Sequence, residues 1–205
     1  MKKIILAIVC TMLMGTAHAT PLYSVSSPIG DTYGNLSYGE IFTVGSQDLT
    51  VTALGAYDHD QDGFLTIGGI QVGLYLESDG SLLTSASVQS SDALDGLFRF
   101  SDIANLTLLS GEQYRIVADT GLDQYNVAEG SATFDSRVTS NGYMQCGDNK
   151  QFCTNGSTGM GYTLMANLQF SDSASGPTPV PEPMSFGLFA LGLAGIRFSR
   201  KLKIQ

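Results

Sequence analysis

The sharpest local pattern that could do chemistry is a run of alternating aspartates, Asp58, Asp60 and Asp62, followed by Gly63. Aspartates at positions 1, 3 and 5 and a glycine at position 6 match the start of an EF-hand-type calcium loop, because Ca²⁺ takes clustered oxygen ligands and glycine allows the sharp turn. Position 12 should be a bidentate glutamate but is Gly69, and the flanking sequence is strand-like, so a complete EF-hand is excluded. Two readings stay open: a simpler calcium loop, and an acidic turn in water, where Asp and Gly are favoured anyway.

Catalytic patterns are weak. His59 is the only histidine expected to remain after export, so a Ser-His-Asp triad would have to use it, and no G-x-S-x-G elbow accompanies it. Carboxylate pairs for glycoside hydrolysis stay open, but the many acidic residues single out no pair. We therefore predict no enzymatic activity and no required cofactor, with a hydrolase as the least favoured alternative.

The two cysteines expected in the exported protein are Cys146 and Cys153. An even number of cysteines in an oxidising compartment predicts a disulfide, and the residues that follow Cys146 are turn-forming. A zinc site has little support, because there is no C-x-x-C pair and His59 is distant in the sequence.

Sugar binding would need aromatic side chains on which sugar rings can stack, and the chain has no tryptophan. Tyrosines within strands are usually core or sheet-face residues. The three tyrosines nearer to loops, Tyr57, Tyr125 and Tyr143, are the better candidates for a glycan ligand.

The N-terminus has the three parts of a secretory signal peptide. Lys2 and Lys3 are positively charged, residues 4–14 are apolar, and Ala17-His18-Ala19 is an A-x-A cleavage site. We expect signal peptidase to cleave after Ala19, so that residues 1–19 are removed. An uncleaved anchor is disfavoured, because the apolar run is too short to span a membrane.

The C-terminus has three parts in fixed order: Pro181-Glu182-Pro183, an apolar stretch at residues 184–196, and a basic cluster. A comfortable transmembrane helix needs about 20 apolar residues, so this stretch is short. The basic cluster favours a cytoplasmic C-terminus. It consists of Arg197, Arg200, Lys201 and Lys203.

Together these features resemble the PEP-CTERM sorting tail of exported proteins in Gram-negative bacteria that make exopolysaccharide. The resemblance implies that an exosortase recognises Pro181, Glu182 and Pro183, that the short helix first anchors the chain in the inner membrane, and that the protein then reaches the cell surface or extracellular matrix. An ordinary single-pass anchor is the alternative.

The part of the chain expected to be exported is much more acidic than its two ends. Only Glu182 of the 19 acidic residues lies outside residues 20–180, which leaves eighteen acidic residues there against four basic ones, a net charge of −14. Such a surface repels nucleic acid and anionic lipid headgroups, and it suits divalent cations. The basic residues are Arg99, Arg115, Arg137 and Lys150.

Strand patterns run through residues 20–170, and glycine, aspartate and serine turns separate them. No helical stretch or long repeat is evident. We predict an all-β fold, a single jelly-roll-like β-sandwich, followed by a Ser/Pro linker at 171–180 and the sorting tail at 181–205. The expected strands are 40–44, 49–54, 70–76, 82–88, 97–100, 113–118, 131–134 and 162–170.

Dispersed motifs in this region are similar to a β-sandwich ectodomain of unknown function found in PEP-CTERM proteins. The motifs are residues 49–55, 62–63, 72–75, 80–83, 98–100, 108–115 and 166–170. The resemblance implies a sandwich fold and a non-catalytic role, and no particular site residues. The expected function is a non-enzymatic surface or matrix protein associated with exopolysaccharide or biofilm; the alternative is a carbohydrate-binding module with a defined glycan.

Overall fold

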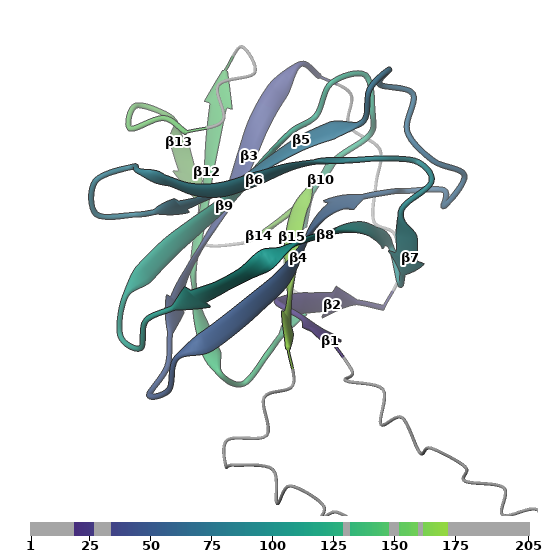
Figure 1. Ribbon diagram of the computed structural model, residues 1–205. Coiled ribbons are helices and arrows are strands. Elements are labelled where there is room, and N and C mark those ends of the chain that lie inside the picture. Colours follow the sequence, from purple (N-terminus) through teal and green to yellow (C-terminus); the bar gives the residue numbers. More distant parts are fainter. Residues whose placement is uncertain (1–18, 27–33, 129–131, 148–151, 160–161, 172–205) are drawn as a thin grey trace, which may run out of the picture. The chain divides into compact units, whose positions relative to one another are not determined.

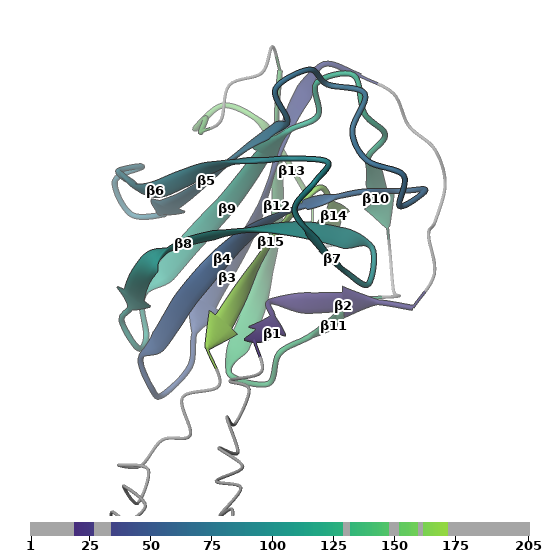
Figure 2. The ribbon, with the colours of Figure 1, turned by 45° about the vertical axis from the view of Figure 1, so that its right-hand side comes forward.

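The computed structural model describes residues 19–26, 34–128, 132–147, 152–159 and 162–171. Within them all regular structure is β-strand, arranged as two large sheets and two small ones (Figures 1 and 2). The all-β sandwich prediction is confirmed. No helix among these residues is long and apolar enough to cross a membrane.

The six-stranded sheet is antiparallel throughout. Its order is β13 (Ser157–Gly159), β12 (Val138–Gly147), β3 (Leu36–Val44), β9 (Gln113–Asp119), β5 (Ile70–Leu76) and β6 (Leu82–Val88). Most of the side chains that alternate inward along these strands are apolar, as expected from the period of two in a strand. On β5, Ile70, Val72 and Leu74 are buried while Gln71 between them is exposed.

The five-stranded sheet lies on the other side of the core (Figure 2). Its order is β1 (Ala19–Pro21), β15 (Ala166–Ser171), β4 (Leu49–Tyr57), β8 (Phe98–Leu108) and β7 (Ala93–Asp95). One continuous cluster of buried residues joins both sheets, with Phe42 and Ile116 from one and Val51 and Phe170 from the other. Burial of each such side chain stabilises the fold by about 1.5–3 kcal/mol.

Two small antiparallel pairs close the sandwich. They are β2 (Tyr23–Val25) with β11 (Ala132–Phe134), and β10 (Asn126–Ala128) with β14 (Tyr162–Leu164). The predicted single strand at 162–170 is therefore two strands. The break falls at Met165, whose carbonyl accepts a hydrogen bond from the Tyr57 amide at 2.9 Å, so the chain changes partner there.

Strand β12 was not predicted from the sequence. Its pairing with β3 shifts register between Ser140 and Tyr143, and Gly142 has a φ of 91°. A residue with positive φ at a bulge favours glycine, because the bend needs a conformation that other residues rarely adopt. The Asn141-Gly142 pair, which also suits a hairpin turn, therefore bends a continuous strand.

The strand register shows which residues lie at each end of the five-stranded sheet. Ser171 at the end of β15 pairs with Ala19, and Phe170 pairs with Val51. Strand β4 runs from there to Tyr57, so the aspartate loop that follows leaves the sheet at the opposite end. The sandwich is one compact unit within Met1–Asp172.

Candidate functional site

Asp58, the first aspartate of the acidic loop, is buried at the end of strand β4. Asp58 directly follows β4, is 1% exposed, and its amide donates to the Leu97 carbonyl at 2.9 Å. Its carboxylate forms an ion pair with Arg99 of the neighbouring strand β8, with 2.6 Å between Nε and Oδ2. A buried carboxylate needs a partner of this kind, because desolvation otherwise makes its charge costly. Sequence reasoning did not connect Arg99 to the loop.

The loop backbone closes tightly around Asp58. The Gly63 amide donates to both carboxylate oxygens of Asp58, at 3.3 and 3.2 Å, and Arg99 Nη2 donates to the Gln61 carbonyl at 3.0 Å. Gly63 has a φ of 108°, and a Cβ at this position would lie 2.8 Å from Ser90. The glycine of the D-x-D-x-D-G pattern is therefore required both by backbone conformation and by space.

The three predicted metal ligands come together. One carboxylate oxygen from each of Asp58, Asp60 and Asp62 can be chosen so that all lie within 4.8 Å of one another. Asp60 and Asp62 are exposed, and the hydrogen bond and charge of Asp60 raise the pKa of Asp62. Two carboxylates this close repel each other unless a proton or a cation lies between them.

A small hollow of about 80 Å³ lies beside these carboxylates. Its lining joins the acidic loop to the chain near Asp123, whose carboxylate accepts hydrogen bonds from the Leu65 amide at 2.6 Å and the Thr66 amide at 3.0 Å. His59, also in the lining, is 2.9 Å from the Tyr57 hydroxyl through Nδ1. The site offers hard oxygen ligands, which suit Ca²⁺ or Mg²⁺ better than softer metals.

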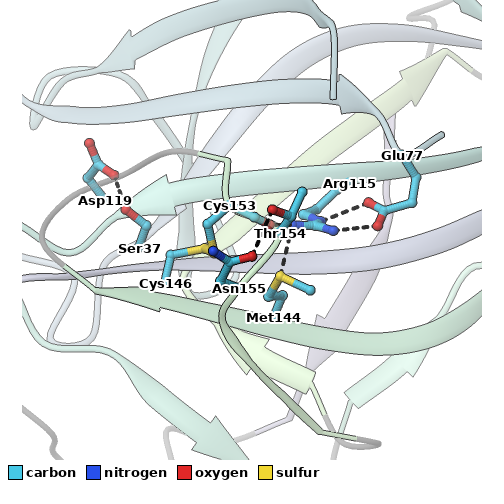
Figure 3. The surroundings of a disulfide bond; sticks show 9 residues. All are labelled: Ser37, Glu77, Arg115, Asp119, Met144, Cys146, Cys153, Thr154 and Asn155. Carbon is cyan, nitrogen blue, oxygen red and sulfur yellow. Dashed lines mark hydrogen bonds and ion pairs between the residues drawn. A yellow bond between two sulfur atoms is a disulfide. The ribbon is translucent and has the colours of Figure 1, made fainter. Parts of the chain in front are cut away.

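Cys146 and Cys153 form a disulfide, as predicted, with 6.0 Å between their Cα atoms (Figure 3). Cys146 is the buried member and lies near the end of β12. The bond therefore fastens the segment at Cys153 to the six-stranded sheet.

Arg115 of β9 holds the same segment on the outer face of that sheet (Figure 3). Its guanidinium makes a two-pronged contact with Glu77, Nε to Oε2 at 2.8 Å and Nη2 to Oε1. Nη1 donates to the Cys153 carbonyl at 2.7 Å, and the guanidinium carbon lies 4.2 Å from the centre of the Phe152 ring. Arg115 is 2% exposed, so this cation is enclosed by its partners.

The prediction that Tyr57, Tyr125 and Tyr143 could serve as platforms for sugar rings is corrected by the structure. Tyr57 and Tyr125 are buried, and neither offers a ring face to solvent. The Tyr125 ring packs on Tyr38 with 4.3 Å between ring centres, and burial followed by the contact with Tyr125 raises the pKa of Tyr38. Tyr143 is half-buried in β12, where it lies against Gly159. Tyr57 and Tyr143 belong to β4 and β12, which extend beyond the strands predicted from the sequence, and Tyr125 packs on Tyr38 of β3.

Glu40 is a buried carboxyl group that sequence reasoning did not single out. It lies on β3, 0% exposed, and accepts hydrogen bonds from Ser140 Oγ at 3.0 Å and from the Thr163 amide at 3.3 Å. Burial raises its pKa well above the ordinary range, although both hydrogen bonds act in the other direction. The sequence gives one signal for this buried carboxyl group: Glu40 occupies a position of β3 at which the alternating pattern places core side chains.

Each arginine of the sandwich forms an ion pair with a carboxylate. Arg99 pairs with Asp58, Arg115 with Glu77, and Arg137 with Asp135 at 2.7 Å. These are the basic residues within the described part of the chain. The outward charge of that part is therefore almost wholly acidic.

The processing sites fall at or beyond the ends of the described residues. Ala19, the predicted cleavage residue, is the first described residue and begins β1. The sorting residues Pro181, Glu182 and Pro183, the linker at 171–180 beyond Ser171 and the predicted short helix lie outside the described residues. The signal peptide, its cleavage and the linker stay predictions.

Comparison with known proteins identifies the tail. No curated protein matches the chain. Among solved structures, the chain is similar to the VP2 subviral particle of infectious bursal disease virus, with 10% identity and a TM-score of 0.27 over 76% of this chain. The chain spans 41% of the length of that structure's chain. The PEP-CTERM protein-sorting motif matches residues 179–201, so this is an exported protein that an exosortase sorts, anchored in the membrane by its tail and then exposed at the surface.

Proposed function

We propose that the mature protein is a non-enzymatic component of the cell surface or extracellular matrix of a Gram-negative bacterium, associated with exopolysaccharide. The sorting motif at residues 179–201 carries the proposal, because it directs the chain to that surface. The sandwich supports the proposal as well, because its arginines form ion pairs with carboxylates of the same chain and the charge that remains on its surface is acidic. An acidic surface keeps the protein soluble and retains divalent cations, which also bridge anionic polysaccharides.

A structural role also agrees with where the perturbed carboxyl groups lie. Glu40, whose pKa is strongly raised, is enclosed in the core and out of reach of a substrate. Asp62, whose pKa is also raised, lies beside the hollow and is fully exposed next to Asp60. Burial raises the pKa of Asp119 on β9 as well, and Ser37 Oγ donates to its Oδ1 at 2.5 Å. General acid catalysis requires a carboxyl group with a raised pKa that touches its substrate in a water-poor pocket, and neither Glu40 nor Asp62 meets both conditions.

The experiment that tests the proposal follows the C-terminus. In the native host we expect the mature protein to lose its tail and to fractionate with the cell surface or matrix polysaccharide. A strain without exosortase should retain the peptide that ends at Gln205 in the membrane fraction. Mass spectrometry of the C-terminal peptide checks both. An intact Gln205 end in both strains would leave the tail as a simple membrane anchor.

A second part of the proposal is that Asp58, Asp60 and Asp62 bind Ca²⁺. The carboxylate oxygens already lie within 4.8 Å of one another, and the loop is closed by Gly63. We expect calcium to raise the melting temperature by mass action on the folded state, which is worth about 2.7 kcal/mol at a hundredfold excess over the dissociation constant. Differential scanning fluorimetry with and without calcium measures the shift.

The matched variants separate this site from general charge effects. Asp60→Asn with Asp62→Asn should abolish the calcium response, whereas Asp95→Asn with Asp102→Asn removes the same charge from exposed positions outside the loop and should keep it. If both double variants respond to calcium as the wild type does, the loop is an acidic turn in water.

A further inference from the structure

Arg99 makes contacts in the acidic loop (residues 58–63) of the kind that a bound metal ion makes. Its guanidinium donates to the Asp58 carboxylate from Nε at 2.6 Å, to the Gln61 carbonyl from Nη2 at 3.0 Å and to the Asp92 carbonyl from Nη1 at 3.1 Å. Carboxylate and backbone carbonyl oxygens are also the ligands that Ca²⁺ takes in proteins. The side chain of Arg99 is 13% exposed and that of Asp58 is 0% exposed. The loop therefore has a cation of its own, supplied by the neighbouring strand β8.

This cation holds Asp58 back from a metal ion. Both Asp58 oxygens accept from the Gly63 amide, at 3.3 and 3.2 Å, and Oδ2 also accepts from Arg99. A metal ion that shared Asp58 would lie close to the guanidinium, and the two positive charges would repel each other. The charge left for a metal ion comes mainly from Asp60 and Asp62, which are exposed. Since calcium affinity depends on the charge of the ligands, the native loop should bind calcium weakly.

We infer that Arg99 sets the calcium affinity of the acidic loop. It neutralises Asp58, holds the loop in place without metal, and keeps the dissociation constant in the weak range of extracellular calcium modules, roughly 10⁻⁴–10⁻³ M. The inference rests on the proposed calcium function of Asp58, Asp60 and Asp62, and it adds how that site is regulated. Arg99 is a positioning residue in this site, because it acts on the ion through Asp58.

The chain that follows the acidic loop has attachments that do not involve Arg99. The Phe64 amide donates to Ser90 Oγ at 2.8 Å. The Asp123 carboxylate accepts from the next two amides along the chain, at 2.6 and 3.0 Å. Loss of the guanidinium should therefore free the charge of Asp58 more than it loosens the loop, and the calcium affinity should rise.

Isothermal titration calorimetry with CaCl₂, on the full chain in a mild non-ionic detergent, measures the dissociation constant. Arg99→Gln should bind Ca²⁺ at least about tenfold more tightly than the wild type, because Asp58 then joins the ligands with its full charge. Without calcium the same variant should melt at a lower temperature, since Asp58 has lost its counter-ion. A purely structural role for Arg99 predicts the lower melting temperature but no gain in affinity.

Three further variants isolate the charge beside Asp58. Arg99→Lys keeps a positive charge there and should bind Ca²⁺ as weakly as the wild type. Arg137→Gln removes the same charge from the ion pair with Asp135 and should leave the dissociation constant unchanged. Asp58→Asn combined with Arg99→Gln removes both charges of the buried pair, so this double variant should fold without calcium and should lose the gain in affinity.

The outcomes separate this inference from the proposed calcium function. If the wild type binds calcium and Arg99→Gln binds it no more tightly, or cannot be folded even with calcium, the inference is wrong and the calcium site stands. Binding by Arg99→Gln alone would contradict calcium binding by the native loop and support the role of Arg99. A gain that persists in the double variant would overturn the inference, because Asp58 would then have no part in it. Binding by neither protein would overturn both proposals.

Discussion

Replacing Glu40 by glutamine is expected to stabilise the sandwich at neutral pH and above, and to change its stability little near pH 4. Glu40 is fully buried on β3, and the described arginines are paired elsewhere. Burial raises its pKa in the folded protein well above the ordinary value of 4.5, so between these two pKa values the folded state holds a proton that the unfolded chain has released. Glutamine keeps an acceptor oxygen for the Thr163 amide and turns its NH₂ toward Ser140 Oγ, a hydroxyl that can also accept, so the site has no charge to bury.

The direction of the pH dependence follows from proton binding. Below the unfolded pKa both states are protonated, and Glu40 contributes no slope. Between the unfolded and folded pKa values the folded state binds more protons, so stability falls as pH rises, by up to about 1.4 kcal/mol per pH unit. Glu40→Gln removes this slope, and the stability advantage of the variant over the wild type should therefore widen as the pH rises from about 4 toward the raised pKa of Glu40 in the folded protein.

Urea denaturation of both proteins at several pH values measures this difference. Other titrating groups are common to the two proteins and cancel in it. Glu112→Gln, at an exposed position in the turn before β9, removes the same charge and serves as the control; its difference from the wild type should stay within about 0.5 kcal/mol. A Glu40→Gln advantage that does not change with pH would mean that Glu40 is ionised in the folded state.

The strands that were predicted correctly are those whose pattern is local. Residues 70–76 and 82–88 match β5 and β6, because alternation and the Asp79-Gly80 turn between them are both visible in the sequence. Gly80 has a φ of 72°, as this turn requires. Strand β12 was missed because its pairing with β3 and the bulge at Gly142 are set by partners far away in the sequence.

In the candidate site, too, the contacts between residues close in the sequence could be predicted and the long-range contacts could not. The aspartates share a short segment and the cysteines lie close in the chain, so local spacing brought each set together. Arg99 reaches Asp58 through the register of β4 with β8, across 41 residues of sequence. Tyr57 and Tyr125 failed as ligand candidates for the same reason, since only the fold shows that their rings turn inward. A sequence shows which groups exist, while the strand register decides which of them are neutralised or enclosed.

The Arg115–Glu77 pair gives the second large expected effect. Glu77→Gln should lower the free energy of unfolding by about 3 kcal/mol, because it leaves the guanidinium of Arg115, 2% exposed, without its counter-ion. The same change should loosen the disulfide segment, since Arg115 also holds the Cys153 carbonyl and packs on Phe152. Chemical denaturation measures the first effect, and hydrogen exchange at residues 152–156 measures the second.

Two further variants show whether the unpaired charge is the cause. Arg115→Met combined with Glu77→Gln removes the buried charge itself and should recover part of the lost stability, since an apolar side chain in the same place leaves nothing unneutralised. Asp135→Asn breaks the Arg137 pair, in which the arginine side chain is 30% exposed, and should cost about 1 kcal/mol or less because water can solvate Arg137. If Glu77→Gln costs no more than Asp135→Asn, then water reaches Arg115 as well, and the ion pair contributes little to holding the segment on the sheet.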